Sequence, residues 1–193
     1  MAEFSVESVL EEITPIWENR VAIYEGKVKL EKPLSYFARA IRGGRGNLEN
    51  CRITVSEMEK YSTVLSKHTI LDDVDVFEKE WGKRFPEINV RTRDLTMINL
   101  AKYFVADITE ESTGVGYEIY EAQFLKKPSA LFCHEKAKNR STMLLYTDRL
   151  IKPTFEELLN LHGIKISIHY YNDQNIKEVA EREIRNLFTT PIR

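Results

Sequence analysis

The sequence lacks the features of a disulfide-bonded, metal-binding or membrane-spanning protein. Its two cysteines, Cys51 and Cys133, are isolated, and its four histidines form no pair at a metal-ligand spacing. No apolar run approaches the roughly 18 residues that a membrane span needs, and the N-terminus has no basic segment of the kind that opens a signal peptide. We therefore expect a cytoplasmic protein, with the nucleus as the alternative, that has free thiols and no metal site.

An excess of one sign of charge is also absent. The formal net charge is −2 at pH 7, which argues against a nucleic-acid partner held by bulk electrostatics. At 193 residues the chain suits one domain with a sizeable core. Since no repeat or long linker divides it, we expect one domain over residues 34–193, preceded by an N-terminal extension over residues 1–33.

The N-terminal extension gives a weak structural signal. Its pattern predicts a helix over residues 5–13, limited by Pro15, and a short hairpin over residues 20–30 around Gly26. We expect this segment to pack on the domain or on a partner subunit.

The rest of the chain alternates between strand and helix patterns. Strands are predicted over residues 34–41, 62–68, 103–108, 128–133 and 164–170. Helices are predicted over residues 48–61, 90–101, 155–161 and 175–188, near residue 114 onward, and as a surface helix that contains Trp81. The alternation predicts an α/β fold with a five-stranded parallel sheet and flanking helices, Rossmann-like or flavodoxin-like.

The stretch from Phe104 to Glu118 is the first candidate site. It reads as strand, polar loop and helix, which places the loop at the carboxyl end of a strand, where open α/β sheets bind ligands. If the helix begins near Gly114, Glu118 falls in its first turn, where the helix dipole favours the ionised form. Such a carboxylate could act as a nucleophile or charge stabiliser, or it could simply be a solvated helix residue.

A second candidate is the glycine- and arginine-rich turn at residues 42–47. Backbone N–H groups at the start of the following helix suit an anionic ligand, and Arg42 and Arg45 could add charge-assisted hydrogen bonds. The spacing matches neither a dinucleotide fingerprint nor a P-loop, and a solvated turn is the alternative. His68 is predicted at the end of a strand, in a structural or a functional role. Asp94 near a helix start could be only a favourable first-turn charge.

Three segments considered together resemble a known family. They are Tyr36–Gly44 with its Ile-Arg-Gly-Gly ending, Arg93–Leu95 at the head of a helix, and Ala106–Glu118 with Ser-x-Gly-Val-Gly-Tyr-Glu. In this order and spacing they resemble the 2′-deoxynucleoside 5′-monophosphate N-glycosidases, or N-hydrolases, of the nucleoside 2-deoxyribosyltransferase superfamily. The resemblance extends to residues 63–68 and 139–143 and leaves the N-terminal extension out.

The resemblance implies a role for each matching residue. Glu118 corresponds to the nucleophilic glutamate, Asp94 to the acidic residue that protonates or holds the departing base, and Tyr36 to the tyrosine that hydrogen-bonds the nucleophile. The implied substrate-binding positions, several of them for the phosphate, are Ile41, Arg42, Gly43, Gly44, His68, Ser112, Gly114, Ser141 and Met143. Because the family's serine at position 141 reaches the phosphate from the neighbouring subunit, the resemblance also implies a homodimer with shared sites.

The implied activity is hydrolysis of 2′-deoxynucleoside 5′-monophosphates to free base and 2-deoxyribose 5-phosphate, without a cofactor. Alternatives are a nucleoside 2-deoxyribosyltransferase, which passes the sugar to another base, and a non-catalytic nucleotide-binding module. The sequence departs from the family at Ala40, where a serine usually donates to the phosphate, and at Arg39, which replaces a glycine. A guanidinium could replace the lost hydroxyl contact or obstruct the pocket.

Overall fold

Five parallel strands form one sheet in the computed structural model, which describes residues 4–41, 47–137 and 166–190. The strands are β1 (Leu34–Ala38), β2 (Thr63–Val64), β3 (Tyr103–Asp107), β4 (Ser129–His134) and β5 (Ile166–Tyr171). Their spatial order is β2-β1-β3-β4-β5, and every neighbouring pair is parallel. This is the flavodoxin-like order, so the predicted α/β class is confirmed.

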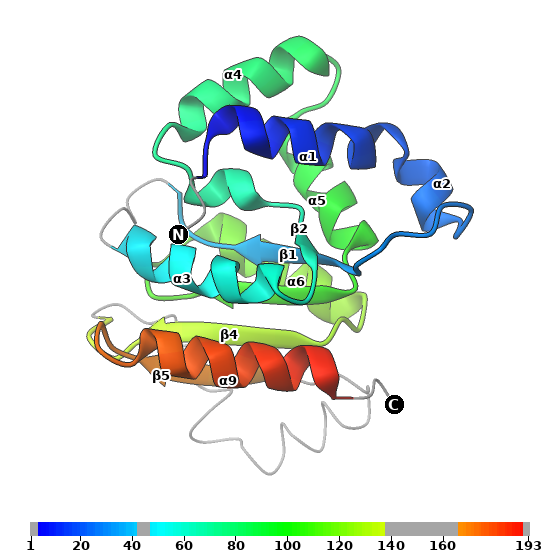
Figure 1. The fold of residues 1–193 in the computed structure, drawn as a ribbon. Coiled ribbons are helices and arrows are strands. Elements are labelled where there is room, and N and C mark those ends of the chain that lie inside the picture. Colours follow the sequence, from blue (N-terminus) through cyan, green and yellow to red (C-terminus); the bar gives the residue numbers. More distant parts are fainter. Residues whose placement is uncertain (1–3, 42–46, 138–165, 191–193) are drawn as a thin grey trace.

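Helices cover both faces of the sheet. They are α3 (Leu48–Glu59), α5 (Val90–Leu100), α6 (Thr113–Phe124) and α9 (Ile176–Thr189), while α4 (Val74–Arg84) lies farther out and packs on η2 (Lys67–Ile70) and the N-terminal helix. The helices α3 and α9 pack side by side on one face, whereas α5 and α6 lie on the other (Figure 1). The helix predicted over residues 155–161 lies outside the described residues. Within the described part of the chain, no helix has the length and apolarity needed to span a membrane.

Alternation along the strands produces two hydrophobic clusters. Tyr36 and Phe104 belong to the cluster beneath α5 and α6, while Phe37 and Val105, the next residues of the same strands, belong to the cluster beneath α3 and α9. Successive side chains of a strand point to opposite faces, and β1 and β3 are buried throughout. Tyr36 is therefore directed to the face on which the helices of both predicted acidic residues lie.

The N-terminal segment forms two helices, α1 (Val6–Glu18) and α2 (Arg20–Tyr24), so the predicted hairpin at residues 20–30 is wrong. The α1 helix begins at a capping box made by Ser5 and Ser8, and it continues through Pro15. Proline removes one helical hydrogen bond. The following turn nevertheless buries Trp17, so burial of the apolar face outweighs the predicted stop.

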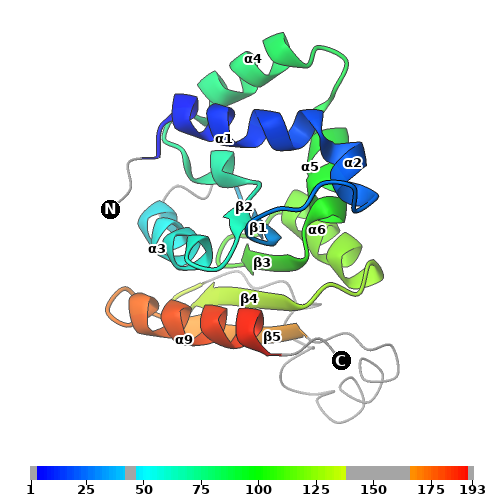
Figure 2. The same ribbon diagram turned by 45° about the vertical axis from the view of Figure 1, so that its right-hand side comes forward.

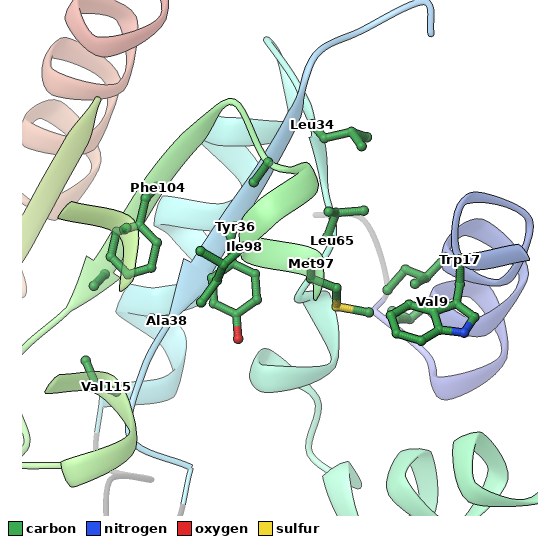
Figure 3. Packing of buried hydrophobic residues seen from close by; sticks show 14 of the residues in the cluster. Val9, Trp17, Leu34, Tyr36, Ala38, Leu65, Met97, Ile98, Phe104 and Val115 are labelled. Carbon is green, nitrogen blue, oxygen red and sulfur yellow. The ribbon is translucent and has the colours of Figure 1, made fainter. Parts of the chain in front are cut away.

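The α1 helix packs into the same cluster as the sheet. Val9 and Trp17 of α1 lie beyond Met97, across the cluster from Tyr36 of β1 (Figure 3). Figure 2 shows α1 beside α4, and Trp17 contacts Trp81 of α4 edge to face with ring centroids 5.3 Å apart. The predicted surface helix around Trp81 thus has one fully buried side. The division into an N-terminal extension over residues 1–33 and a domain over residues 34–193 stays a prediction.

The second strand is shorter than predicted. The strand pairs with β1 at Thr63 and Val64, and the chain then forms a 3-10 helix, η2 (Lys67–Ile70). Lys67 is almost fully buried and forms ion pairs with Glu12 of α1 and Glu59 of α3. These contacts fix η2, and with it His68, against the first and third helices.

Candidate active site

Glu118 lies on α6, directly after the loop that follows β3. The side chain of Ser112 caps this helix by accepting from the N–H of Val115 at 3.4 Å, so the helix begins at Thr113. Glu118 consequently lies in the second turn, and the prediction that it occupies the first turn is wrong. The helix dipole acts mainly within the first turn, so it does not account for the charge state of Glu118.

Tyr36 is the direct partner of Glu118. Its phenol donates a hydrogen bond of 2.6 Å to Oε1 of Glu118 across a separation of 82 residues in sequence. Burial and the charges of Glu118 and Asp94 hold the pKa of Tyr36 well above 10, so the phenol remains a donor. Burial also raises the pKa of Glu118 to about 7, against the hydrogen bond from Tyr36, which lowers it. Asp94 raises the Glu118 pKa further and Arg93 lowers it.

Asp94 lies on α5, close enough to Glu118 for its charge to raise the pKa of that residue. The helix begins at Val90 with Asn89 as its cap, so Asp94 follows the first turn and is not the predicted first-turn charge. Its side chain is 18% exposed and accepts from Nε of Arg93 at 2.9 Å. Burial raises the pKa of Asp94, while Arg93 opposes this change. A carboxyl group with a raised pKa beside a second carboxylate can act as a proton donor.

His68 lies on η2 rather than at the carboxyl end of a strand. Its ring stacks on Phe77 with centroids 4.7 Å apart, and Nε2 lies 3.0 Å from Nη2 of Arg93. Burial and the charge of Arg93 hold the pKa of His68 well below 6.5, so the imidazole is neutral. The structure therefore connects His68 to Asp94 through Arg93.

Arg93 and Glu78 are the site residues that sequence reasoning missed. Arg93 belongs to a segment that carries the family resemblance, but no role was assigned to it. A charged residue adjacent to a proposed acid was the available signal. Glu78 of α4 gave none, because its contact with Arg93 depends on how α4 packs against α5.

Part of the predicted phosphate site can be placed. Ser112 is half-buried at the start of α6, and Gly114 is exposed in its first turn. Arg42, Gly43, Gly44, Ser141 and Met143 lie outside the described residues. Ile41 lines a small pocket, the other lining residues of which are Arg39, Leu48, Thr69, Leu71, Asp72 and Val74. None of the predicted catalytic residues lines this pocket.

The two departures from the family pattern are both buried. Nε of Arg39 donates to the carbonyl of Ala40 at 3.1 Å. Arg39 follows Ala38, the last residue of β1, and it lines the same small pocket as Ile41.

Comparisons with known proteins give relatives but no match to a family model. The chain is 32% identical over 117 residues to the 5-hydroxymethyl-dUMP N-hydrolase of Tetraodon nigroviridis, which covers 58% of this chain and 79% of that protein. It is 30% identical over 113 residues to the enzyme of the same name in Esox lucius, covering 56% and 75%. The chain belongs to the N-hydrolase family.

The human relative shows how much of a longer N-hydrolase the similarity covers. The human 5-hydroxymethyl-dUMP N-hydrolase is 31% identical over 116 residues, which is 58% of this chain and 64% of the human protein. The similarity thus spans less than two thirds of the human relative. It supports the family resemblance found from the sequence motifs, and the substrate of this chain is addressed below as a proposal.

Replacing Tyr36 by phenylalanine should move the acidic limb of the pH–rate profile to higher pH. The hydrogen bond from Tyr36 lowers the Glu118 pKa, so its loss raises that pKa and leaves less carboxylate at neutral pH. We expect kcat/KM at pH 7 to fall roughly tenfold or more, because hydrogen bonds to charged groups contribute about 1.5–3 kcal/mol. Steady-state kinetics from pH 5 to 9 measure the limb, with Tyr24→Phe on exposed α2 as control. An unmoved limb would contradict the assigned contact.

Replacing Glu118 by glutamine should stabilise the fold above pH 7. The folded-state pKa of about 7 exceeds the ordinary 4.5, so the folded chain binds more protons and loses stability as pH rises between these values. Because glutamine does not ionise, the variant avoids this loss. Its free energy of unfolding should exceed that of the wild type by up to about 3 kcal/mol at pH 8 and by little at pH 5. Urea unfolding at both pH values tests this, with exposed Glu110→Gln as the control. Equal stability of wild type and variant at pH 8 would show that Glu118 titrates normally.

Proposed function

We propose that the chain hydrolyses the N-glycosidic bond of 2′-deoxynucleoside 5′-monophosphates, releasing free base and 2-deoxyribose 5-phosphate. The observation that carries this proposal is the 2.6 Å hydrogen bond from Tyr36 to Glu118, with Asp94 within electrostatic range of the same carboxylate. Cleavage passes through an oxocarbenium-like state, which a nearby carboxylate stabilises. The names of the relatives, which are N-hydrolases of deoxynucleoside monophosphates, support the same reaction.

In the first step, an ionised Glu118 oxygen attacks C1′ of the sugar. The bond from C1′ to the base nitrogen breaks, and the electron pair leaves with the base. Asp94, in its protonated form, gives its proton to the departing base or to a group conjugated with that nitrogen. The product is a 2-deoxyribosyl ester of Glu118. Tyr36 holds the attacking carboxylate in position throughout this step.

In the second step, a water molecule attacks C1′ of the ester. The Asp94 carboxylate accepts a proton from that water, and Glu118 leaves with the electron pair of the broken ester bond. Both carboxyl groups return to their starting states, and 2-deoxyribose 5-phosphate is released. No oxidant or reductant is consumed.

Recognition of the 5′-phosphate is assigned by resemblance to the turn at residues 41–44, Ser112 and Ser141. The placement of Ser112 at a helix start supports this assignment, because helix N-termini attract anions. We propose that Arg39 supplies charge in place of the serine hydroxyl that is missing at Ala40. The phosphate would then distinguish monophosphates from unphosphorylated nucleosides.

We also propose a cytoplasmic homodimer in which Ser141 of the partner subunit completes each site. Cys51 and Cys133 are buried and are not joined in a disulfide, which suits a reducing compartment. The exposed face of α6 supports association, because Tyr117, Tyr120 and Phe124 are 42%, 60% and 70% exposed at helical spacing. Sedimentation at increasing protein concentration should show a dimer, and a Phe124→Asp variant should shift it toward monomer.

The experiment that tests the proposed reaction compares phosphorylated and unphosphorylated substrates. Purified protein is incubated with each deoxynucleoside monophosphate, and with each deoxynucleoside plus a free acceptor base, and products are separated by chromatography. Free base and 2-deoxyribose 5-phosphate from monophosphates alone would support the hydrolase. Base exchange on unphosphorylated nucleosides would show a transferase instead. Nucleotide binding without turnover would overturn both enzymatic readings.

A further inference from the structure

Three nitrogens of one buried guanidinium bind three acceptors near the proposed site. Nε of Arg93 donates to Oδ1 of Asp94 at 2.9 Å, and Nη1 donates to Oε2 of Glu78 at 2.8 Å. Nη2 lies 3.0 Å from Nε2 of His68. The acceptors come from α5, α4 and η2, so Arg93 connects three separate elements at one point.

The surroundings of Arg93 leave it little freedom to move. Only 1% of its surface is exposed, and its guanidinium lies 5.6 Å from the ring centre of Phe77 and 5.7 Å from that of Trp81. The planar group is therefore held by hydrogen bonds in its plane and by aromatic rings nearby. Glu78 supplies a second negative charge to the guanidinium, and the two carboxylates bind different guanidinium nitrogens.

Arg93 also determines which nitrogen of His68 carries a proton. A guanidinium has only donors, so Nε2 of His68 must accept the hydrogen bond from Nη2. The neutral imidazole then carries its proton on Nδ1. This atom is buried and has no hydrogen-bond partner within the described residues. An unsatisfied buried donor is uncommon in a purely structural cluster.

We propose that Arg93 is a positioning residue of this active site, which fixes the Asp94 carboxyl group and the His68 tautomer together, with Glu78 as its own anchor. The proposal rests on the function proposed above. Because Arg93 binds Oδ1, the second oxygen of Asp94, Oδ2, is the one presented to the departing base. Arg93 does not contact the reacting atoms and acts through Asp94.

Lysine cannot replace arginine in this role. It would keep the positive charge, but a single ammonium group cannot reproduce the planar fork that binds Asp94, Glu78 and His68 at once. Charge and geometry can therefore be separated by one substitution. A role in charge balance alone predicts that Arg93→Lys retains activity, whereas positioning predicts that it does not.

The kinetic test uses Arg93→Lys in the wild-type and Asp94→Asn backgrounds. We expect kcat for deoxynucleoside monophosphates to fall on the order of 100-fold in the first background, because small displacements of catalytic groups have effects of this size. KM should change less than about threefold, since the phosphate is bound elsewhere. In the Asp94→Asn background, Arg93→Lys should lower kcat by less than about threefold. Wild-type kcat in Arg93→Lys, or equal losses in both backgrounds, would overturn the proposal.

A second measurement is independent of both turnover and the stability of the variants. In the unaltered protein labelled with 15N-histidine, His68 should show the neutral tautomer protonated on Nδ1. A proton on Nε2 would overturn the proposal even if Arg93→Lys failed to fold. If His68 shows the expected tautomer but the protein releases no base, the proposed function is wrong, whereas the hydrogen bonding assigned to Arg93 is supported. For the kinetic test, the control variant is Arg84→Gln on the exposed surface of α4, and its kcat and KM should equal those of the wild type.

Discussion

Asp94→Asn should lower kcat for deoxynucleoside monophosphates by about 100- to 10,000-fold, the range that positioned proton donors contribute. Asparagine is close in size and keeps an oxygen that can accept from Arg93, so the contact at Oδ1 is expected to survive. What is lost is the proton that the departing base receives. Burial is the main cause of the raised pKa of Asp94, and this is the direction of shift that a proton donor requires.

The leaving group distinguishes a proton-donor role from a general loss of structure. A 7-methylguanine nucleotide already carries a positive charge on its base, which departs as a neutral molecule and needs no proton. We therefore expect Asp94→Asn to lower kcat for that substrate by less than about tenfold. Rapid-quench kinetics on both substrates measure this. Equal losses on the two would contradict the assigned role, and unchanged thermal unfolding would verify that the variant is folded.

Trp17→Ala should destabilise the protein by about 3–5 kcal/mol, as large-to-small changes of buried aromatic residues do. Trp17 is 2% exposed and contacts Trp81 edge to face, and it lies 6.0 Å from the ring of Phe85. Removing it leaves a cavity between α1 and α4. Urea unfolding measures the change, with Tyr24→Ala on exposed α2 as control, for which less than about 0.5 kcal/mol is expected.

The Trp17→Ala substitution also tests whether the N-terminal helix α1 supports the candidate site. Trp81 stacks on Phe77, and Phe77 stacks on His68, with ring centroids 5.8 and 4.7 Å apart. A cavity at Trp17 therefore adjoins the residues that hold His68 and Arg93. If Trp17→Ala cost less than about 1 kcal/mol, α1 would be an appendage rather than part of the core that supports the site.

The sheet was predictable from the sequence because its strands are buried and bounded by turn residues. The β3 strand and the helix after it were recognised from aromatic and β-branched residues followed by helical spacing at Val115, Ile119 and Ala122, all of which are buried. Periodicity failed where local signals conflict with tertiary packing. Pro15 suggested an end to α1, but burial of Trp17 extends the helix past it.

The site was less predictable than the fold, because its contacts join distant segments. Tyr36 and Glu118 could be paired only through the family resemblance, since no local pattern relates residues so far apart. The charge state of Glu118 was misjudged for a definite reason. Capping by Ser112 places the helix start one residue before Gly114, and burial, not the dipole, determines the pKa.

The most direct test of this account is base release from deoxynucleoside monophosphates by the unaltered protein and by Glu118→Ala, followed chromatographically at pH 8. The account predicts free base from at least one of the four monophosphates with the unaltered protein. It predicts none above background with the variant, which should bind nucleotide and remain folded. Base release by Glu118→Ala at the rate of the unaltered protein, or no release by the unaltered protein from any of the four, would contradict it.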